Sequence, residues 1–279
     1  METIGSVRMQ VVLARTALVA THLLVGLWIG AALPAWGASV VCGGTIGPGG
    51  TVKLDADVGP CAFNQPITVT GSAVLNLNGH QISCNQAVGF QPVIILNGQG
   101  AVVKKGRLTG CGIAVLVLGQ GNTVNQIDCD QNIDCIWLGG NGGHTVTKND
   151  IHNNGHTGIV DIDSAGLNRI RNNNLQNNGF SGIYIQQNGD DVRNNKSDGN
   201  GGSGIQIAAG GATVRNNHTS NNLMHGIFVG GNILGQNNDI RANRALGNTD
   251  SDLADAWGDC AHNMWKKNSF GTRNPLCIQ

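Results

Sequence analysis

Three acidic side chains between positions 128 and 134 are the residues of this sequence best suited to bind a metal ion. Asp128, Asp130 and Asp134 would present the oxygen ligands that calcium prefers. Asp is also a common turn residue, because its side chain bonds to nearby backbone. We therefore treat a solvated turn as the simpler interpretation and calcium as its alternative, and we expect no other cofactor.

Basic side chains suited to proton abstraction follow in the next segment. They are Lys148, His152, His156 and Arg169. Such residue types act as general bases, but they are also frequent at polar turns, which is the simpler explanation for their scatter. Cys-x-x-Cys metal motifs, nucleotide-binding loops and Ser or Cys nucleophile motifs are absent from the sequence. Whether this protein is an enzyme stays open.

The elements that position these residues are set by a repeat of about 23 residues. Its first part is Gly-Ile-x-apolar, and a fixed period of this length is typical of a solenoid, in which stacked repeats share one core. Three short apolar runs per period, separated by Gly and Asn, indicate three strands and three turns per coil. Asp161 would point inward beside Ile159, where the longer 24-residue spacing predicts a bulge instead. The repeated isoleucines are Ile113, Ile136, Ile159, Ile183, Ile205 and Ile227.

Two series of asparagines stand at fixed positions in the repeat, three and eight residues after an apolar residue of the second strand. Because an amide both donates and accepts, we expect stacked copies to bond to one another and to the turn backbone. The first series is Asn149, Asn173, Asn195, Asn217 and Asn243, and the second is Asn154, Asn178, Asn200, Asn222 and Asn248.

The second-strand positions predict nine coils, which at a strand spacing of ~4.8 Å form a stack roughly 40 Å tall. Residues 39–66 are expected to form an N-terminal cap or first coil, residues 67–249 the repeats, and residues 250–279 a C-terminal coil and cap with aromatic residues over the last open edge. The predicted positions are Leu77, Val103, Val124, Val146, Ile170, Val192, Val214, Ile240 and Trp265.

A stripe of arginines follows the inward residue of the second strand and should therefore point outward. It comprises Arg171, Arg193, Arg215 and Arg241, and Lys266 extends it. The simpler interpretation is a solvated face. The alternative is a site for an anionic polysaccharide, because Arg binds carboxylate or sulfate in a bidentate manner.

The first strand carries a second outward column that includes Trp137, Tyr184 and Phe228 in alternate coils. Ala114, Val160 and Gln206 complete the column. Aromatic faces roughly 10 Å apart, two strand spacings, would suit stacking against sugar rings. Aromatic residues also favour exposed strands without any ligand, which is the simpler interpretation.

Residues 1–38 have the pattern of a secretory signal peptide, with an uncleaved membrane anchor as the alternative. Net charge is zero, and Glu2 is the only Glu, so nothing indicates nucleic acid or, after signal removal, a membrane as a partner. Eight cysteines, all after residue 38, indicate an oxidising compartment, and we expect a secreted or periplasmic protein.

The repeat register narrows the disulfide pairings. Cys84 and Cys111 stack one coil apart, and two further pairs bracket the caps. The two middle pairs have an alternative, a Cys111–Cys135 disulfide, because these two cysteines also fall at similar register. The pairs we expect are Cys42–Cys61, Cys84–Cys111, Cys129–Cys135 and Cys260–Cys277.

The sequence resembles the right-handed parallel β-helix superfamily, which includes pectate lyases, polygalacturonases and alginate epimerases. It is similar in particular to secreted bacterial β-helix proteins that carry a Leu-Asn-Gly-His-x-Ile string, here Leu77 to Ile82, and an Asp-Cys-x-x-Asn-x-Trp string near the end, here from Asp259. This resemblance covers roughly residues 42–279 and implies an all-β, single-stranded, right-handed parallel β-helix. It implies little about activity, because the repeat encodes stacking.

The resemblance leaves three functions open. Hydrolases of the superfamily carry paired Asp with Gly-His-Gly, and alginate epimerases carry Asp-Pro-His-Asp; neither string occurs here. We therefore expect a secreted β-helix that binds extracellular polysaccharide. A lyase or epimerase acting on an acidic polysaccharide and a structural surface protein are the alternatives.

Overall fold

The computed structural model describes residues 40–62, 64–85, 89–230 and 235–279. The chain divides into two units, residues 1–36 and 37–279, and the first lies outside the described residues. The predicted signal peptide of residues 1–38 therefore also lies outside them.

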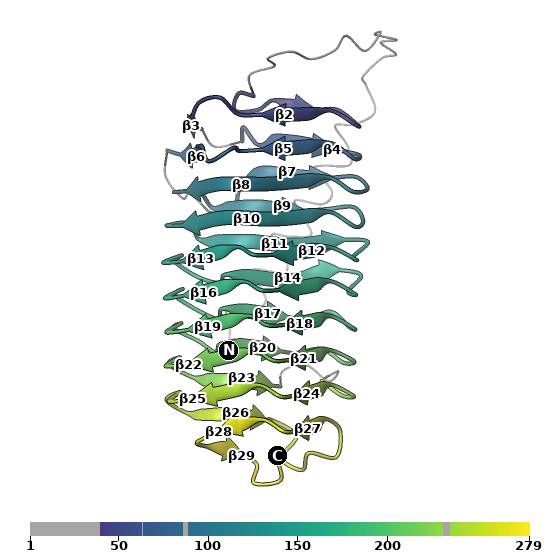
Figure 1. Cartoon of the computed structure of the whole chain (residues 1–279), viewed down its shortest axis with the longest axis vertical. Helices are drawn as coiled ribbons and strands as arrows, with labels where there is room; N and C mark the ends of the chain where they lie inside the picture. The colour runs from purple at the N-terminus through teal and green to yellow at the C-terminus, as the bar shows by residue number, and fades with distance from the viewer. Residues whose placement is uncertain (1–39, 63, 86–88, 231–234) are drawn as a thin grey trace. The chain divides into compact units, whose positions relative to one another are not determined.

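Every regular element among the described residues is a β-strand, and successive coils stack in parallel (Figure 1). The first sheet takes one strand from each coil and holds 11 strands. In order these are β1 (Thr45–Ile46), β4 (Ile67–Thr70), β7 (Pro92–Asn97), β9 (Ile113–Val117), β11 (Asp134–Gly140), β14 (Ile159–Ser164), β17 (Ile183–Ile185), β20 (Ile205–Ile207), β23 (His225–Val229), β26 (Ser251–Asp255) and β29 (Arg273–Asn274).

The second sheet carries the next strand of each coil. Its strands are β2 (Thr51–Lys53), β5 (Val74–Asn76), β8 (Val102–Thr109), β10 (Thr123–Asp130), β12 (Thr145–Thr147), β15 (Arg169–Arg171), β18 (Asp191–Arg193), β21 (Thr213–Arg215), β24 (Asp239–Arg241) and β27 (Met264–Lys266). These ten strands exceed the nine predicted coils, because β2 pairs with β5 and adds a coil at the N-terminal end.

The third sheet completes each coil. Strands β8 and β10 turn the corner from the second sheet and contribute their C-terminal halves. The other strands are β3 (Val58–Cys61), β6 (Gln81–Cys84), β13 (Asp150–His152), β16 (Asn174–Gln176), β19 (Lys196–Asp198), β22 (His218–Ser220), β25 (Arg244–Leu246) and β28 (Ser269–Phe270).

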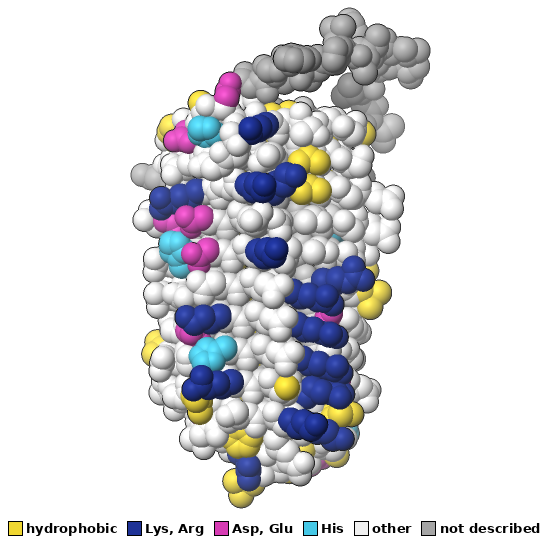
Figure 2. All heavy atoms as spheres, in the orientation of Figure 1, with side chains coloured by type: hydrophobic (Ala, Val, Ile, Leu, Met, Phe, Trp, Pro, Cys, Tyr) yellow, Lys and Arg dark blue, Asp and Glu magenta, His cyan; other side chains and the backbone are white. Residues whose placement is uncertain are grey.

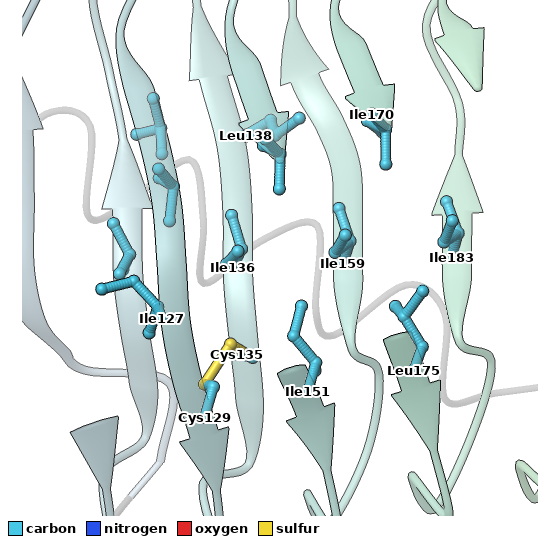
Figure 3. Packing of buried hydrophobic residues seen from close by; sticks show 14 of the residues in the cluster. Ile127, Cys129, Cys135, Ile136, Leu138, Ile151, Ile159, Ile170, Leu175 and Ile183 are labelled. Atoms are coloured by element: carbon cyan, nitrogen blue, oxygen red, sulfur yellow. A yellow bond between two sulfur atoms is a disulfide. The ribbon is translucent and has the colours of Figure 1, made fainter. Parts of the chain in front are cut away.

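Side chains of all three sheets alternate between the solenoid interior and its surface, which is the alternation expected of strands. Leu138, Ile159 and Leu175, from neighbouring strands of the first and third sheets, are fully buried and point into the same interior (Figure 3). The disulfide of Cys129 and Cys135 crosses this interior between β10 and β11. One continuous apolar column therefore holds the coils together.

The predicted register is wrong in the early coils. Leu75, and not Leu77, pairs with Val103. Leu77 lies beyond the strand, fully buried, and its N–H donates to the Lys104 carbonyl at 2.8 Å. Both leucines face the interior, so the apolar pattern did not separate them.

Both predicted asparagine ladders are present. Asn217 shows their geometry: its backbone N–H and its Nδ2 both donate to Oδ1 of Asn243, at 2.9 and 3.0 Å. Its Nδ2 also donates to the Val192 carbonyl of the previous coil at 2.9 Å. The residue before each first-ladder asparagine is left-handed; Asn216, for example, has φ 56°, a conformation that Asn tolerates. The ladder thus satisfies buried turn amides that no strand can reach.

A third ladder, which we did not predict, lies two residues before the inward residue of the second strand. His144 belongs to it: its Nδ1 accepts the Asn122 N–H at 3.2 Å, so Nε2 carries the proton and donates to the Gly139 carbonyl at 2.8 Å. Burial lowers the pKa of His144 and favours this neutral form. The members are Asn122, His144, Asn168, Asp190, Asn238 and Asn263.

The C-terminal coil supplies the acceptors that end the ladders. Asp252 Oδ1 accepts from the backbone N–H and Nδ2 of Asn248, at 3.0 and 2.8 Å, and Asp255 Oδ2 accepts from Nδ2 of Asn263 at 3.1 Å. Burial would raise the pKa of Asp252, but the hydrogen bonds outweigh it and hold that pKa below its ordinary value. The structure also contains the four disulfides predicted from the register: Cys42–Cys61, Cys84–Cys111, Cys129–Cys135 and Cys260–Cys277.

Candidate functional site

The predicted arginine stripe forms a straight outward column on the second sheet. Arg171, Arg193, Arg215 and Arg241 pair in register from β15 to β24, and Lys266 of β27 continues the column. Each arginine side chain is about one-third exposed, between 31 and 38%. The stems therefore cover the sheet while the guanidinium groups reach solvent, as expected for amphipathic side chains.

Two aspartates, each two residues before an arginine of the column, bridge these arginines in pairs. Asp191 bonds to Arg171 and Arg193, and Asp239 bonds to Arg215 and Arg241. Burial would raise the pKa of Asp239, but hydrogen bonds from Arg241 and Arg215 outweigh it and lower the pKa. The four arginines thus carry a surplus of two positive charges over the two aspartates, and Lys266 adds a third to the column.

Further lysines and one arginine enlarge this column into a basic face, defined here as the Lys and Arg of the second sheet and of the left-handed turn after it. Figure 2 shows these side chains gathered in a line over the second-sheet strands. Asp191 and Asp239 are the only acidic residues at these positions in the described chain. Eleven of the fifteen Lys and Arg that follow residue 38 belong to the basic face: Lys53, Lys104, Lys105, Lys148, Arg169, Arg171, Arg193, Arg215, Arg241, Lys266 and Lys267.

The aromatic column of the first sheet is less open than its sequence pattern indicates. Trp137 is only 9% exposed, because Phe90 packs against it with ring centroids 5.7 Å apart. Its neighbours in register are Leu116 and Val160, so the predicted place of Ala114 in this column is wrong and Ala114 is fully buried. The register at β9 is shifted by two residues from the predicted one, because Val115 and not Ile113 pairs with Ile136.

The other two aromatic residues of this column are half-buried. Tyr184 accepts a hydrogen bond from Nε2 of Gln186, and burial raises the pKa of its hydroxyl. Phe228 lies against His225 with ring centroids 4.9 Å apart. Sugar stacking on this column stays a prediction, with Tyr184 and Phe228 as its more accessible members.

A cluster of aromatic rings surrounds one histidine near the start of the first-sheet strands, and we call it the His156 cluster: Phe90, Asp134, Trp137, His156 and Phe180. Asp134 is buried, and its Oδ1 accepts from the Thr157 N–H at 2.7 Å and lies 2.9 Å from His156 Nδ1. The imidazole stacks on Phe180 at 5.2 Å and meets the Phe90 edge at 6.3 Å. The hydrogen bond to Asp134 raises the pKa of His156.

The structure does not bring the proposed calcium ligands together. Asp130 pairs with Arg107, Asp128 lies 3.0 Å from His152, and Asp134 bonds within the His156 cluster. The part of the chain that the structure describes contains no group of three or more His, Cys, Asp or Glu suited to a metal ion. The calcium alternative is therefore wrong for these three carboxylates.

The four candidate bases also separate. Lys148 and Arg169 belong to the basic face, His152 lies in β13 of the third sheet, and His156 precedes β14. They form no common site. Only His156 has a buried carboxylate partner that fixes its orientation.

A buried pair of carboxyl groups inside the solenoid was not predicted. Asp161 faces inward after all, and the register shift that we expected in its place comes after it, leaving Ile162 unpaired. Asn168 Nδ2 donates to Asp161 Oδ2 at 2.9 Å, and the Asn168 N–H donates to Asp190 Oδ1 at 2.8 Å. Burial, with the neighbouring Asp161, raises the pKa of Asp190 to about 10. The remaining oxygens, Asp161 Oδ1 and Asp190 Oδ2, are buried without another partner among the described residues, so a proton on Asp190 would let it donate to Asp161.

Solved structures that share this architecture include an alginate epimerase, a pectate lyase and a mannuronan C-5 epimerase. The periplasmic alginate epimerase AlgG has a TM-score of 0.56 at 12% identity, covering 78% of this chain and 67% of that one. Pectate lyase Pel9A has 0.54 at 16%, covering 82 and 67%, and the mannuronan C-5 epimerase AlgE6 A-module of Azotobacter vinelandii has 0.54 at 15%, covering 79 and 65%. The chain thus spans about two thirds of each, and the likeness shows the fold alone. No curated protein matches it.

A family profile described as "Periplasmic copper-binding protein (NosD)" matches residues 67–276. The chain belongs to the NosD family. Copper prefers thiolate, thioether and imidazole ligands. All eight cysteines are in disulfides, and Met264 Sδ lies 3.6 Å from the Arg241 guanidinium. His225 is bonded through Nδ1 to Ser251 at 2.9 Å. The described residues of this NosD-family chain therefore do not fit a copper site.

Across the described part of this NosD-family chain, no helix is long and apolar enough to cross a bilayer.

Proposed function

We propose that this protein binds a linear acidic polysaccharide along its basic face. The observation that carries the proposal is the segregation of charge: eleven cations lie along one line of a chain whose net charge is zero. Coils repeat at a spacing of ~4.8 Å, so the cations form a regular series that suits a polymer with repeated carboxylates or sulfates. The protein is secreted or periplasmic, in agreement with the description of its family.

The aspartates in the column explain how the face stays ordered without a ligand. Asp191 and Asp239 keep adjacent guanidinium groups from repelling one another. An arriving carboxylate offers the same bidentate contact to the free edges of these guanidinium groups. Binding of this kind depends on exposed charges and weakens with salt, because such charges are screened within about 8 Å at physiological ionic strength.

Binding to polygalacturonate, measured by calorimetry at 50 and 500 mM NaCl, tests the proposal. We expect affinity to fall steeply with salt and to be about tenfold weaker in Arg193→Gln/Arg215→Gln, a change of about 1.4 kcal/mol. Asp191→Asn should bind more tightly, since it removes one negative charge from the face. Arg244→Gln, an exposed arginine in β25 of the third sheet, is the matched control and should bind normally.

Two results would contradict the proposal. One is affinity that does not change with salt. The other is an equal loss in Arg244→Gln and in the double variant, which would show that net charge and not the basic face attracts the polymer. Salt-independent binding that is lost in Tyr184→Ala would instead place the site on the aromatic column.

A further inference from the structure

The His156 cluster has features that the basic face does not need. It lies at the edge of the first sheet, where β11 and β14 begin, whereas the basic face follows the second sheet. Its histidine side chain is 48% exposed, although the carboxylate that holds it is 98% buried. A buried carboxylate is costly unless it is hydrogen-bonded, and Asp134 is bonded by the Thr157 N–H and by Nδ1 of His156.

The contacts fix the orientation of the imidazole. Nδ1 faces Asp134 at 2.9 Å, and the ring lies flat on Phe180 with an interplanar angle of 4°. Among the described residues nothing bonds to Nε2, which leaves this atom free to donate outward. Its other ring neighbour, Phe90, is uncharged, and among the described residues Asp134 is the charged group that bonds to His156.

We infer that the His156 cluster is a second binding site, which takes a single carboxylate-bearing sugar ring such as a uronate. The carboxylate accepts from Nε2–H of the imidazolium, and the sugar ring lies against Phe90, which is 43% exposed. A cation beside aromatic rings suits a ligand that has one anionic group and one apolar face. Asp134 does not touch the ligand; it positions His156.

The charge on the imidazole gives this site a direction of pH dependence. The hydrogen bond to Asp134 raises the pKa of His156, so the cation persists to a higher pH than for a free histidine. Ligand binding is therefore complete below that raised pKa and declines as the pH rises through it. Asp134→Asn removes the negative partner and shifts this decline to lower pH.

NMR of the histidine ring resonances, with D-galacturonate and neutral D-galactose as matched probes, tests the inference. At pH 6 we expect saturable shifts of the His156 resonances with galacturonate, at least tenfold weaker binding of galactose, and loss of galacturonate binding at pH 9. His156→Gln should lose binding at least tenfold. The control is His152→Gln, since His152 also has a carboxylate partner but lies in the third sheet away from the aromatic rings.

Several outcomes would overturn the inference. These are equal binding of galactose, unchanged binding in His156→Gln, or equal loss in His152→Gln. Asp134 is buried, so the pH shift of Asp134→Asn is interpreted only if that variant folds. Phe90 is on the surface, and Phe90→Ala should weaken galacturonate binding because the sugar ring is proposed to lie against this side chain. Arg193→Gln/Arg215→Gln should leave galacturonate binding intact, so that failure of the basic face and failure of this site are distinguishable.

Discussion

In the coils of β8 and β10 the turn after the second strand has no asparagine at its buried position, whereas from β12 onward an asparagine occupies it. Gly106 in the coil of β8 and Ile127 in the coil of β10 stand at the position that Asn149 occupies in the coil of β12. Ile127 is buried, and a Cβ at Gly106 would meet Leu77 Cβ at 2.3 Å. In the second ladder, Cys111 stands one coil before Asn132, whose Oδ1 accepts the Cys111 N–H, and Cys111 forms a disulfide with Cys84. One backbone path therefore accepts two kinds of interior.

The two kinds of interior differ in how strictly they define register. A slip in the later coils would separate Asn217 from Asn243 and leave buried amides without partners, at about 1–3 kcal/mol each. A slip of two residues in the early coils exchanges Leu75 for Leu77, and both remain buried. Polar ladders thus specify the fold, and the apolar coils need another constraint.

We expect the largest effect from removing that other constraint. Cys84→Ala/Cys111→Ala should lower the free energy of unfolding by about 3 kcal/mol, because the bond spans 27 residues of an interior that has little polar specificity. The Cys129–Cys135 disulfide closes a loop of only 6 residues, so Cys129→Ala/Cys135→Ala should cost less free energy of unfolding. Urea unfolding measures both. A larger loss in the second variant would show that the early coils hold their register without help.

Replacing a central asparagine of the first ladder should lower the free energy of unfolding by nearly as much. Asn217→Leu deprives Asn195 of its acceptor and removes the side-chain donor to Asn243 and to the Val192 carbonyl, and we expect a loss on the order of 3 kcal/mol. Ile127→Leu, at the equivalent position in an early coil, should cost under about 1.5 kcal/mol. Asn141→Ala, at an exposed position, should change the urea midpoint little. Equal losses at positions 217 and 127 would remove the distinction between the two interiors.

The buried pair of Asp161 and Asp190 places an acid in the third ladder, and replacing Asp190 tests whether the fold is more stable without that acid. The folded pKa of Asp190, about 10, lies above its ordinary 3.8, so its contribution is complete below about pH 4 and is lost as the pH rises toward 10. Asp190→Asn keeps an acceptor for Asn168, donates to Asp161 and needs no proton. Relative to wild type it should gain up to about 1 kcal/mol per pH unit between pH 5 and 8. A difference that is constant with pH would show that no proton is shared.

The smallest effect is expected at Thr219 in the third sheet. Its Oγ1 is buried without a hydrogen-bond partner, at an interior position where Leu175 stands two coils earlier. Thr219→Val should therefore be neutral or stabilise the fold by about 1 kcal/mol. A clear loss in thermal unfolding would indicate that this hydroxyl is bonded in solution.

Periodicity explains which parts of the site were predictable. Each arginine of the column follows an inward Val or Ile, as Arg193 follows Val192, so its outward direction was evident from the sequence. The bridging Asp191 was equally visible, since Asp-Val-Arg and Asp-Ile-Arg place an acid two residues before the arginine. Asp134 and His156 stand 22 residues apart, one repeat, which is the signal that would have paired them.

Other features had no periodic signal. Phe90 covers Trp137 from a segment outside the repeat, so the sequence alone left that ring exposed. The third ladder mixes Asn, His and Asp, and Ala212 interrupts it, donating its N–H to Asn238 at 2.8 Å. A ladder requires only an acceptor at each step, so its members need not share a residue type.

The common direction of the ladder amides has an electrostatic consequence. At each step of a ladder one side-chain N–H donates to the next coil and the amide oxygen faces the previous one, so the column carries a dipole, as aligned peptide groups do in a helix, with its positive pole at the C-terminal end. Asp252 and Asp255 place negative charge at that pole. A solenoid of this kind therefore cannot be lengthened there by adding repeats alone: an added coil would have to move the anionic cap with it.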